Sequence, residues 1–400
     1  MTVVEHSRPG TAGDAIDGVT PVRVAEPSSG RECAAALAAA AAGGQSTVLR
    51  GGGTKMGWGR PVQSVDLVVS TARLDETLIH RDGDLTATVG AGVPLGRLNA
   101  ALATRGQWLP VDSAFAGATI GGVLATNDAG PLRYRYGTPR DLLIGITLAL
   151  TDGRVVKAGG TVVKNVAGYD LGKLVTGSYG ALAAIVDATF KLLPVPHTSS
   201  TLRAVYADPD VLAADAGAIA ASQLEPLAFD VGGSDHWSLL VRFASSPASV
   251  ATQVAAARAL LRGDVSIMTD QEEAAVWAAQ LSLPWHDPGA VIRCSWMPSR
   301  LAQVLALVHE LRTQCDVTLI GRAGTGTGLL RLRGSEPALA AAITRARLDA
   351  SPVGHVVLLH GSRSLKTQID VWGAAAGAPA MALKRALDPT GILNAGRGPV

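Results

Sequence analysis

The stretch VLRGGGTK, residues 48–55, places three successive glycines directly after a short apolar strand that ends near Leu49. Glycine has no Cβ to keep a ligand away from the backbone, and it adopts positive φ without strain. Consecutive amides can therefore converge on an anion such as a diphosphate. The loop is not a Walker A loop, because no Gly-Lys-Ser/Thr closes the required spacing. Taken alone, such a cluster is also compatible with an ordinary turn.

Three further glycine clusters lie beside predicted strand ends in the same half of the chain. They are GAG at residues 90–92, AGATIGGVLATN at residues 116–127 and GSYG at residues 177–180. The small residues and hydroxyls of the second of these allow close backbone approach together with directional hydrogen bonds. Each cluster could serve only helix packing or a tight turn. Four clusters in one domain favour one long ligand that is contacted at several points.

The GAG cluster raises the alternative of a Rossmann dinucleotide fold, because it follows a strand and precedes a helix. Two features count against that alternative. Pro94 interrupts the loop, and Asp112, at the distance expected for the ribose-binding acid, lies in the loop-like segment LPVDS. A single GxG is a weak signal, so an NAD(P) site is the less favoured interpretation.

The composition excludes several classes of function. The chain has 35 basic and 33 acidic residues, a net charge of +2 and 4% aromatic residues, which leaves no basic patch or stacking surface typical of nucleic-acid binding. Its three cysteines, Cys33, Cys294 and Cys315, are far apart and predict no disulfide framework, metal site or iron–sulfur site within this chain. The longest apolar run, residues 33–42, is well short of the roughly 20 residues that span a bilayer. No leader is recognised, so a soluble, cytoplasmic protein is expected.

The composition and periodicity of the chain predict four regions. Residues 1–20 lack periodicity and are expected to be a disordered arm. Residues 21–196 alternate strands and helices with the rhythm of a parallel sheet, include an Asp152-Gly153 hairpin, and end at Pro194-Val195-Pro196. Residues 197–375 predict an antiparallel sheet with helices on one face, and residues 376–400 form a C-terminal segment that returns to the first domain.

The order of the motifs resembles a known family. RGGGTKMGWG, GATIGGVLATNDAGPLRYRYGTPRD, KNVAGYDLGKLVTGSYGALAAI and DPTGILNAGRG occur as in the FAD-linked oxidases of the vanillyl-alcohol oxidase type, and are most similar to the FAD-binding E subunit of bacterial glycolate oxidase. The resemblance covers about residues 21–196 and the last thirty or so. It implies an α+β fold, with a two-subdomain PCMH-type FAD-binding domain and a smaller antiparallel-sheet-plus-helices cap domain.

The resemblance also implies which residues hold FAD. The first glycine loop would hold the pyrophosphate, the stretch 117–127 would contact the pyrophosphate and flavin, residues 177–185 would line the adenosine side, and the tail would return to the flavin ring. The expected residues are Gly51, Gly52, Gly53, Thr54, Lys55, Gly117, Ala118, Thr119, Gly121, Gly122, Thr126, Asn127, Gly177, Ser178, Gly180, Ile185, Asn394 and Arg397. Some relatives attach FAD through a histidine after the first loop. Thr54 stands there, so a non-covalent flavin is expected.

In this family a hydride passes from a carbon bearing a hydroxyl to the flavin. A 2-hydroxy acid also needs a cation for its carboxylate, preferably a bidentate arginine. Arg293, Arg322, Arg331 and Arg333 lie on or beside predicted cap strands, and Arg322 is the preferred candidate, although each could be an ordinary surface charge. His360 is the candidate general base, and like His355 it could be purely structural.

Three functions stay open. The first is a flavin subunit that oxidises a small 2-hydroxy acid such as glycolate and passes electrons to iron–sulfur and second flavoprotein subunits. The second is a stand-alone flavin oxidase of another alcohol, and the third is a non-catalytic FAD-binding structural subunit. Nothing in the cap matches the metal-binding histidine cluster of related catalytic subunits, so no metal is expected. Any membrane association would be peripheral and through partners.

Overall fold

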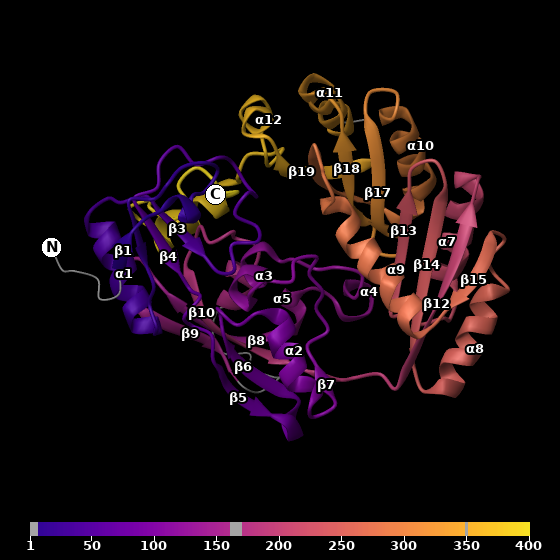
Figure 1. Cartoon of the computed structure of the whole chain (residues 1–400), viewed down its shortest axis with the longest axis horizontal. Coiled ribbons are helices and arrows are strands. Elements are labelled where there is room, and N and C mark those ends of the chain that lie inside the picture. The colour runs from indigo at the N-terminus through magenta and orange to yellow at the C-terminus, as the bar shows by residue number, and fades with distance from the viewer. Residues whose placement is uncertain (1–6, 161–169, 349–350) are drawn as a thin grey trace. The chain divides into compact units, whose positions relative to one another are not determined.

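The computed structural model describes residues 7–160, 170–348 and 351–400, and it divides into two compact units (Figure 1). The first unit comprises the chain up to Ala129, Gly137–Val195 and Ala375–Val400, and the second comprises Gly130–Tyr136 and Pro196–Ala374. The short segment Gly130–Tyr136, which contains α4 (Arg133–Tyr136), therefore leaves the first unit. The ring of Tyr134 packs edge-on against Phe229, with ring centroids 5.7 Å apart.

The first unit begins with a small sheet in the order β1-β2-β4-β3, whose last three strands are parallel. Its strands are β1 (Ser7–Pro9), β2 (Arg23–Ala25), β3 (Thr47–Arg50) and β4 (Leu67–Ser70). Helix α1 (Gly30–Ala42) connects β2 to β3, and the Ser29 hydroxyl accepts a hydrogen bond from the Glu32 amide at its start. The alanine-rich face of α1 is buried, because small side chains let the helix approach the sheet closely.

The expectation of a disordered arm over residues 1–20 is wrong for residues 7–20, and residues 1–6 lie outside the described residues. Strand β1 pairs antiparallel with β2, and Ile16 is buried to 1% exposure. Contacts with distant parts of the chain order this segment. A pattern within the segment does not record such contacts, so its lack of periodicity did not reveal that it is ordered.

The second sheet of the first unit is antiparallel throughout, in the order β5-β6-β10-β8-β9. Its strands are β5 (Thr77–Arg81), β6 (Thr86–Gly90), β8 (Leu143–Ala149), β9 (Val155–Gly159) and β10 (Ala184–Lys191). The predicted Asp-Gly hairpin joins β8 to β9, with Gly153 at φ +87°. The parallel rhythm expected for the whole domain thus holds only for the small sheet, which fits the predicted α+β class.

Short elements complete the first unit around its apolar core. They are α2 (Leu95–Ala103), β7 (Gln107–Trp108), α3 (Ile120–Thr126), α5 (Pro139–Leu142), α6 (Leu171–Val175), β11 (Leu193–Pro194) and α13 (Ala378–Leu387). Helices α2 and α3 bury their apolar sides against the second sheet, in a core that includes Leu98, Leu124 and Phe190. Residues 164–169 of the motif KNVAGYDLGKL lie outside the described residues.

The second unit is built on an eight-stranded antiparallel sheet in the order β15-β12-β14-β13-β17-β18-β16-β19. The strands are β12 (Thr198–Tyr206), β13 (Ala228–Gly233), β14 (Trp237–Ser245), β15 (Asp264–Met268), β16 (Ala290–Trp296), β17 (Asp316–Arg322), β18 (Thr327–Arg333) and β19 (Val353–Gly361). The helices are α7 (Pro209–Ala221), α8 (Pro247–Arg258), α9 (Asp270–Ser282), α10 (Leu301–Leu311), α11 (Glu336–Ala346) and α12 (Arg363–Gln368). Sequence patterns did not predict β13, β15, β17 or α7.

The prediction that the helices cover one face of this sheet is wrong for one helix. Helices α7, α8, α10 and α11 pack on the apolar face, where Phe229 and Val231 of β13 point. Helix α9 lies on the opposite face, because its Trp277 packs on Ala228 and Leu240, which point the other way. We call this opposite side of the sheet the polar face. It carries Asp230, between Phe229 and Val231 in sequence.

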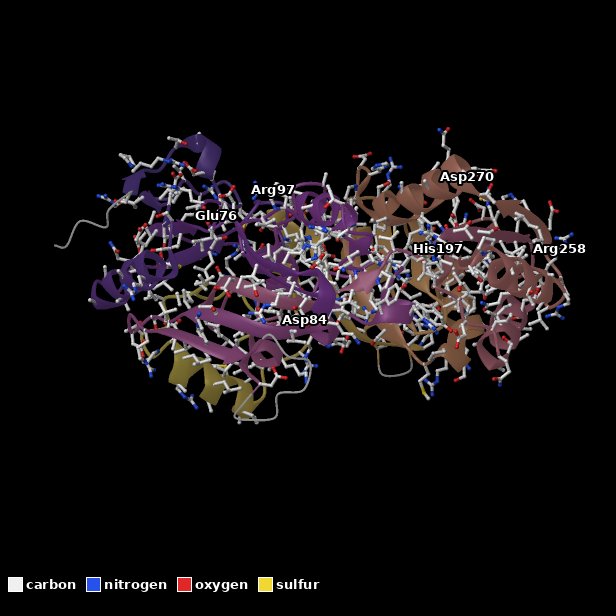
Figure 2. The ribbon with its side chains drawn as sticks, turned by 90° about the horizontal axis from the view of Figure 1, so that it is seen from below. Glu76, Asp84, Arg97, His197, Arg258 and Asp270 are labelled. Atoms are coloured by element: carbon white, nitrogen blue, oxygen red, sulfur yellow. The ribbon has the colours of Figure 1, made fainter. Side chains whose placement is uncertain are left out.

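Charged side chains of both signs are mixed over the surface of each unit (Figure 2). Glu76, Asp84 and Arg97 are exposed on the first unit, and Arg258 and Asp270 on the second. Within the described ranges, no helix combines the length and the apolar character that crossing a membrane requires.

Candidate functional site

Two adjoining hollows of about 610 and 410 Å³ lie in the first unit at the carboxyl ends of β3 and β4. The first is lined by Leu49, Gly51, Gly52, Gly53, Thr54, Lys55, Met56, Trp58, Thr119, Gly122, Ala125, Thr126, Tyr179, Asn394, Arg397 and Gly398. The second is lined by Leu49, Arg50, Gly51, Thr71, Gly121, Gly122, Ala125, Tyr179, Gly180, Ala183, Ala184 and Ile185. Because five residues line both hollows, the two form one elongated groove. We call it the glycine groove.

The first glycine cluster packs so closely on the second that side chains are excluded. A Cβ on Gly51 would lie 2.2 Å from Oγ1 of Thr119, and one on Gly52 would lie 2.0 Å from the carbonyl oxygen of Gly117. The Gly52 amide donates a hydrogen bond to Thr119 Oγ1 at 3.3 Å. Gly53 has φ +73°, which only glycine adopts without strain. The loop is therefore held against residues 117–119, and its other side is open to the groove.

Most of the residues expected to bind cofactor line the glycine groove. Those lining it are Gly51, Gly52, Gly53, Thr54, Lys55, Thr119, Gly121, Gly122, Thr126, Gly180, Ile185, Asn394 and Arg397. Those that do not line it are Gly117, Ala118, Asn127, Gly177 and Ser178. The Thr126 hydroxyl donates at 2.8 Å to the carbonyl oxygen of Gly122, within its own helix.

Sequence reasoning missed ten lining residues. They are Leu49, Arg50, Met56, Trp58, Thr71, Ala125, Tyr179, Ala183, Ala184 and Gly398. Thr71 carried a usable signal, because it directly follows the carboxyl end of β4 and ligands of α/β sheets collect at such ends. Leu49, Ala183 and Ala184 carried no such signal, since alanine and leucine at strand ends look like ordinary core residues.

Lys55 is held by neighbouring side chains and does not present a free ammonium to the groove. Its Nζ forms an ion pair with Asp128 Oδ2 at 3.0 Å, and its side chain is 6% exposed. The ammonium also lies 5.0 Å from the ring centroid of Phe115 and 5.8 Å from that of Trp58, distances typical of cation–π contacts. Lys55 thus ties the first glycine loop to the chain that follows α3.

The motif Asp388-Pro389-Thr390-Gly391 brings the C-terminal segment back to the groove. The Asp388 carboxylate accepts hydrogen bonds from Lys384 Nζ at 2.6 Å, the Leu393 amide at 2.9 Å and the Ile392 amide at 3.2 Å. Lys384 Nζ also donates to the carbonyl oxygens of Ala181 and Leu393, both at 2.8 Å. This buried charge pair turns the chain after α13 and fixes it beside residue 181.

The turn places Asn394 at the groove, where one of its two polar side-chain atoms has no hydrogen bond to the described residues. Asn394 adopts φ +47°, and its Nδ2 donates to the carbonyl oxygen of Tyr179. Its Oδ1 is buried and has no hydrogen-bond partner among the described residues. A buried acceptor without a partner costs free energy, so this oxygen is suited to a ligand donor. The glycine-lined, elongated shape and this acceptor fit a long dinucleotide cofactor such as FAD.

The GAG cluster that mimics a Rossmann fingerprint has a packing role. A Cβ on Gly90 would lie 2.2 Å from the carbonyl oxygen of Leu74, and one on Gly92 would lie 2.2 Å from that of Thr71. Neither glycine lines the glycine groove. These two glycines let residues 90–92 pass directly against residues 71–76.

Residues 21–159 match the family described as the FAD binding domain. The chain is an FAD-linked oxidoreductase with a PCMH-type FAD-binding domain. It is 28% identical over 393 residues to glycolate oxidase subunit GlcD of Bacillus subtilis, covering 88% of this chain and 83% of the relative. It is 36% identical over 222 residues to glycolate oxidase subunit GlcE of Escherichia coli, covering 54% of this chain and 60% of that relative.

Other relatives of this FAD-linked oxidoreductase match over smaller parts. The D-lactate dehydrogenase of Archaeoglobus fulgidus is 36% identical over 171 residues, which are 43% of this chain and 38% of that enzyme. The chain therefore spans less than two thirds of this relative and of GlcE. Among solved structures, an alkyldihydroxyacetonephosphate synthase aligns with a TM-score of 0.71 at 15% identity, covering 94% of this chain and 76% of the synthase. This likeness supports the two-domain fold.

Arg322, the preferred substrate ligand from sequence, is engaged in a buried ion pair on the polar face. Its Nη1 donates to Asp230 Oδ2 at 2.6 Å, and Gln280 Nε2 of α9 donates to the same oxygen at 3.2 Å. Arg322 is 6% exposed and Asp230 is fully buried. Burial raises the pKa of Asp230 to about 6, although the charge of Arg322 opposes the shift.

The other arginine candidates also differ in what they contact. Arg331 donates to the Thr318 hydroxyl at 3.1 Å, and Arg333 pairs with Asp287 at 3.1 Å. Arg293 of β16 lies between the core residues Ile292 and Cys294, so it points to the polar face. It is partly exposed and has no hydrogen bond or ion pair in the described part of the chain.

His360 lies on the strand next to Arg293. It is opposite Val291 in the β16–β19 pairing, two residues along β16 from Arg293 and on the same side of the sheet. Burial lowers the pKa of His360, and Lys366 adds to the shift. The neutral imidazole, which can accept a proton, is therefore favoured near neutral pH. His355 is exposed, at φ +44°, and lies on the rim of a separate hollow in the second unit.

Proposed function

We propose that this FAD-linked oxidoreductase acts on CH–OH groups and oxidises a small 2-hydroxy acid such as glycolate. Relatives named glycolate oxidase subunits, D-lactate dehydrogenase and D-2-hydroxyglutarate dehydrogenase support this substrate class. FAD, when bound, supplies the two-electron acceptor. The chain's own residues must hold the substrate carboxylate and take the hydroxyl proton.

The glycine groove is the proposed FAD site. Residues 51–54 are assigned to the pyrophosphate, because Gly51, Gly52 and Gly53 present backbone without side chains to the groove and Thr54 lines it beside them. Gly180 and Ile185 line the second hollow and are assigned to the adenosine side. Asn394 Oδ1, the buried acceptor without a partner among the described residues, is assigned to a hydrogen-bond donor of the cofactor.

The observation that carries the substrate proposal is Arg293 beside His360 on the polar face. The Arg293 guanidinium has no hydrogen bond or ion pair with the described residues, so it can offer a carboxylate two parallel hydrogen bonds. Arg322 is a weaker choice, because its Nη1 is bound to Asp230. A neutral imidazole on the neighbouring strand is suited to accept the hydroxyl proton. We therefore assign carboxylate binding to Arg293 and proton transfer to His360.

Replacing Arg293 by methionine tests this assignment. We expect kcat/KM for flavin reduction by a 2-hydroxy acid to fall roughly 10–100-fold, the loss of one charge-assisted pair, with FAD content unchanged. Anaerobic stopped-flow bleaching with glycolate, D-lactate and D-2-hydroxyglutarate would measure it. Arg333→Met is the matched control, since Arg333 pairs with Asp287 at the surface. Unchanged bleaching rates in Arg293→Met would refute the role.

The proposal includes partners, because GlcD and GlcE are named as subunits. We propose that electrons pass to an iron–sulfur subunit, with a second flavoprotein subunit in the same cytoplasmic complex. Bleaching of the isolated chain by a 2-hydroxy acid would exclude a purely structural role. Bleaching that appears only after partner subunits are added would exclude a stand-alone oxidase.

The flavin is expected to be held without a covalent bond. Thr54 follows the first glycine loop where some relatives carry the attaching histidine, and a threonine hydroxyl does not form that linkage. Acid precipitation should therefore leave a colourless pellet and a yellow supernatant that contains intact FAD by mass spectrometry. A yellow pellet would contradict the expectation.

A further inference from the structure

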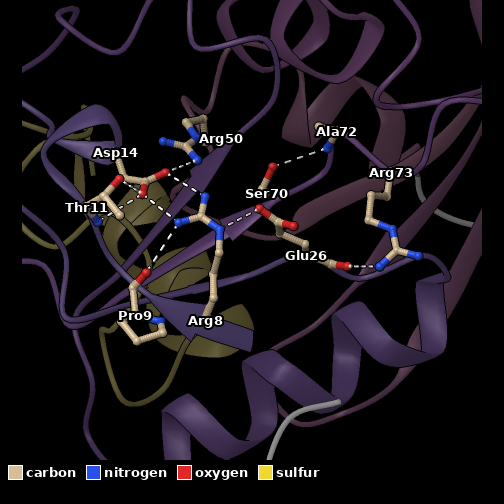
Figure 3. A network of polar contacts seen from close by, with 9 residues as sticks. All are labelled: Arg8, Pro9, Thr11, Asp14, Glu26, Arg50, Ser70, Ala72 and Arg73. Atoms are coloured by element: carbon tan, nitrogen blue, oxygen red, sulfur yellow. Dashed lines mark hydrogen bonds and ion pairs between the residues drawn. The ribbon is translucent and has the colours of Figure 1, made fainter. Parts of the chain in front are cut away.

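Residues 7–20 precede residues 21–159, which match the FAD binding domain, yet they contact Arg50 and Val62 at the two ends of the first glycine loop. The centre of these contacts is Asp14, which is 4% exposed (Figure 3). Its carboxylate accepts hydrogen bonds from Arg8 Nη1 and Nη2 at 2.7 and 2.9 Å, and from the Thr11 amide and hydroxyl at 3.0 and 2.8 Å. It also accepts one from Arg50 Nη2 at 2.9 Å.

Arg50 is the residue through which Asp14 reaches the loop. It is the last residue of β3, directly before Gly51, and its carbonyl oxygen accepts from the Thr71 amide at 2.8 Å. The hydrogen bonds from Arg8 and Arg50 hold the pKa of Asp14 well below its usual range. The carboxylate is therefore ionised throughout the neutral range, and its link to Arg50 persists there.

A second set of contacts holds the other end of the same loop. Asp17 Oδ2 accepts from the Val62 amide at 3.3 Å and from Arg397 Nη2 at 3.4 Å. Arg397 in turn donates at 3.2 Å to the carbonyl oxygens of Trp58 and Arg60. Between the two aspartates, Ile16 is buried in a cluster with Val48 and Val62, the residues that flank the loop.

We propose that residues 14–17 form a clasp that positions the loop of residues 51–62 for FAD, with Asp14 and Asp17 as positioning residues. The inference rests on the proposed place of the FAD pyrophosphate. A glycine-rich loop has a large conformational entropy that cofactor binding must overcome. A clasp that restricts the loop beforehand lowers that cost, so it raises FAD affinity without touching the cofactor.

The test compares Asp14→Asn with Glu26→Gln in the apoprotein. Asp14→Asn removes the charge shared by Arg8 and Arg50, whereas Glu26→Gln removes only the charge of the carboxylate that accepts the 3.1 Å bond from Arg8 Nε and leaves Asp14 in place. We expect the Kd for FAD, from flavin fluorescence quenching, to rise about tenfold in Asp14→Asn, the lower range for a charge-assisted bond, and to stay unchanged in Glu26→Gln. Hydrogen–deuterium exchange of amides 51–62 should quicken in Asp14→Asn alone.

Asp17→Asn provides a second variant if Asp14→Asn does not fold. Asp17 has φ +51°, a conformation that asparagine tolerates, so the backbone should persist. Faster exchange of amides 51–62 with weaker FAD binding supports the clasp. Wild-type affinity and wild-type exchange in a folded Asp14→Asn or Asp17→Asn variant overturn it. Both readouts are independent of substrate, so a wild type that binds FAD but is not reduced by 2-hydroxy acids would refute only the substrate proposal.

Discussion

Replacing Gly52 by alanine is expected to weaken FAD binding roughly 10–100-fold, the range that overpacking a close contact produces. The added Cβ would lie 2.0 Å from the carbonyl oxygen of Gly117, and the rigid backbone on both sides leaves no flexible side chain to move. The loop must shift into the glycine groove, where it would occupy the space that we assign to the pyrophosphate. Flavin content after purification and the Kd for FAD would measure the loss.

Gly57→Ala is the matched control for this prediction. Gly57 lies in the same loop, and a Cβ there would meet nothing within 4 Å. We expect this variant to bind FAD as the wild type does, because the added methyl group would displace no neighbouring atom. Equal affinities in the two variants would show that the close contact between the two glycine clusters does not shape the site.

Replacing Arg322 by methionine is expected to destabilise the second unit by about 3–5 kcal/mol, the cost of leaving one member of a buried ion pair alone. Asp230 would lose its 2.6 Å partner while remaining fully buried. Cysteines report on the two units separately, because Cys294 lies in β16 and Cys33 in α1, both buried. Thiol labelling followed by mass spectrometry should therefore quicken at Cys294 and not at Cys33.

The loss of stability of the second unit in Arg322→Met should depend on pH. Burial raises the pKa of Asp230 to about 6, above its unfolded value of 3.8, so the folded protein binds the extra proton between these values. Stability linked to this group therefore decreases as the pH rises through that window. Without Arg322 the window extends to higher pH. Because any thiol reacts faster at higher pH, the comparison is the ratio of the Cys294 labelling rate in Arg322→Met to that in the wild type, and this ratio should be larger at pH 8 than at pH 5.

A double variant separates loss of the ion pair from loss of packing. Replacing both partners, with Arg322→Met and Asp230→Leu, removes the buried charges together, and such exchanges are often neutral. We expect slow labelling of Cys294 to return. Continued fast labelling in the double variant would indicate that the side chains matter through their shape.

The role of the first glycine cluster could be predicted because its signal is local. The absence of Cβ atoms in residues 51–53, followed by further clusters in a fixed order, indicated one long ligand, and the resemblance to FAD-linked oxidases implied FAD and most of the residues that line the groove. Close approach of backbone to ligand demands glycine whatever surrounds it. The return of residues 376–400 to the first domain was likewise predicted, although the bond between Asp388 and Lys384 that turns this segment was not.

The ion pair of Arg322 and the contacts of Asp14 could not be predicted, because the residues that each contacts are remote in the chain. Asp230 is 92 residues from Arg322, and Arg50 is 36 residues from Asp14. A periodic pattern records which side of a strand is apolar, but not which charge on a neighbouring strand meets it. The same holds for α9, whose weakly amphipathic sequence did not reveal which face of the sheet it would cover.

The sequence by itself indicated one long ligand, and its resemblance to FAD-linked oxidases implied FAD, the order of the loops that line the groove proposed for it, and the α+β class, since these motifs consist of residues adjacent in the chain. The tertiary structure alone decided that residues 7–20 are ordered, that Arg322 is bound to Asp230, and that Arg293 keeps a guanidinium without a partner among the described residues. The physical reason is that charge pairing and burial are set by distance in space, which chain closure creates and local spacing does not encode.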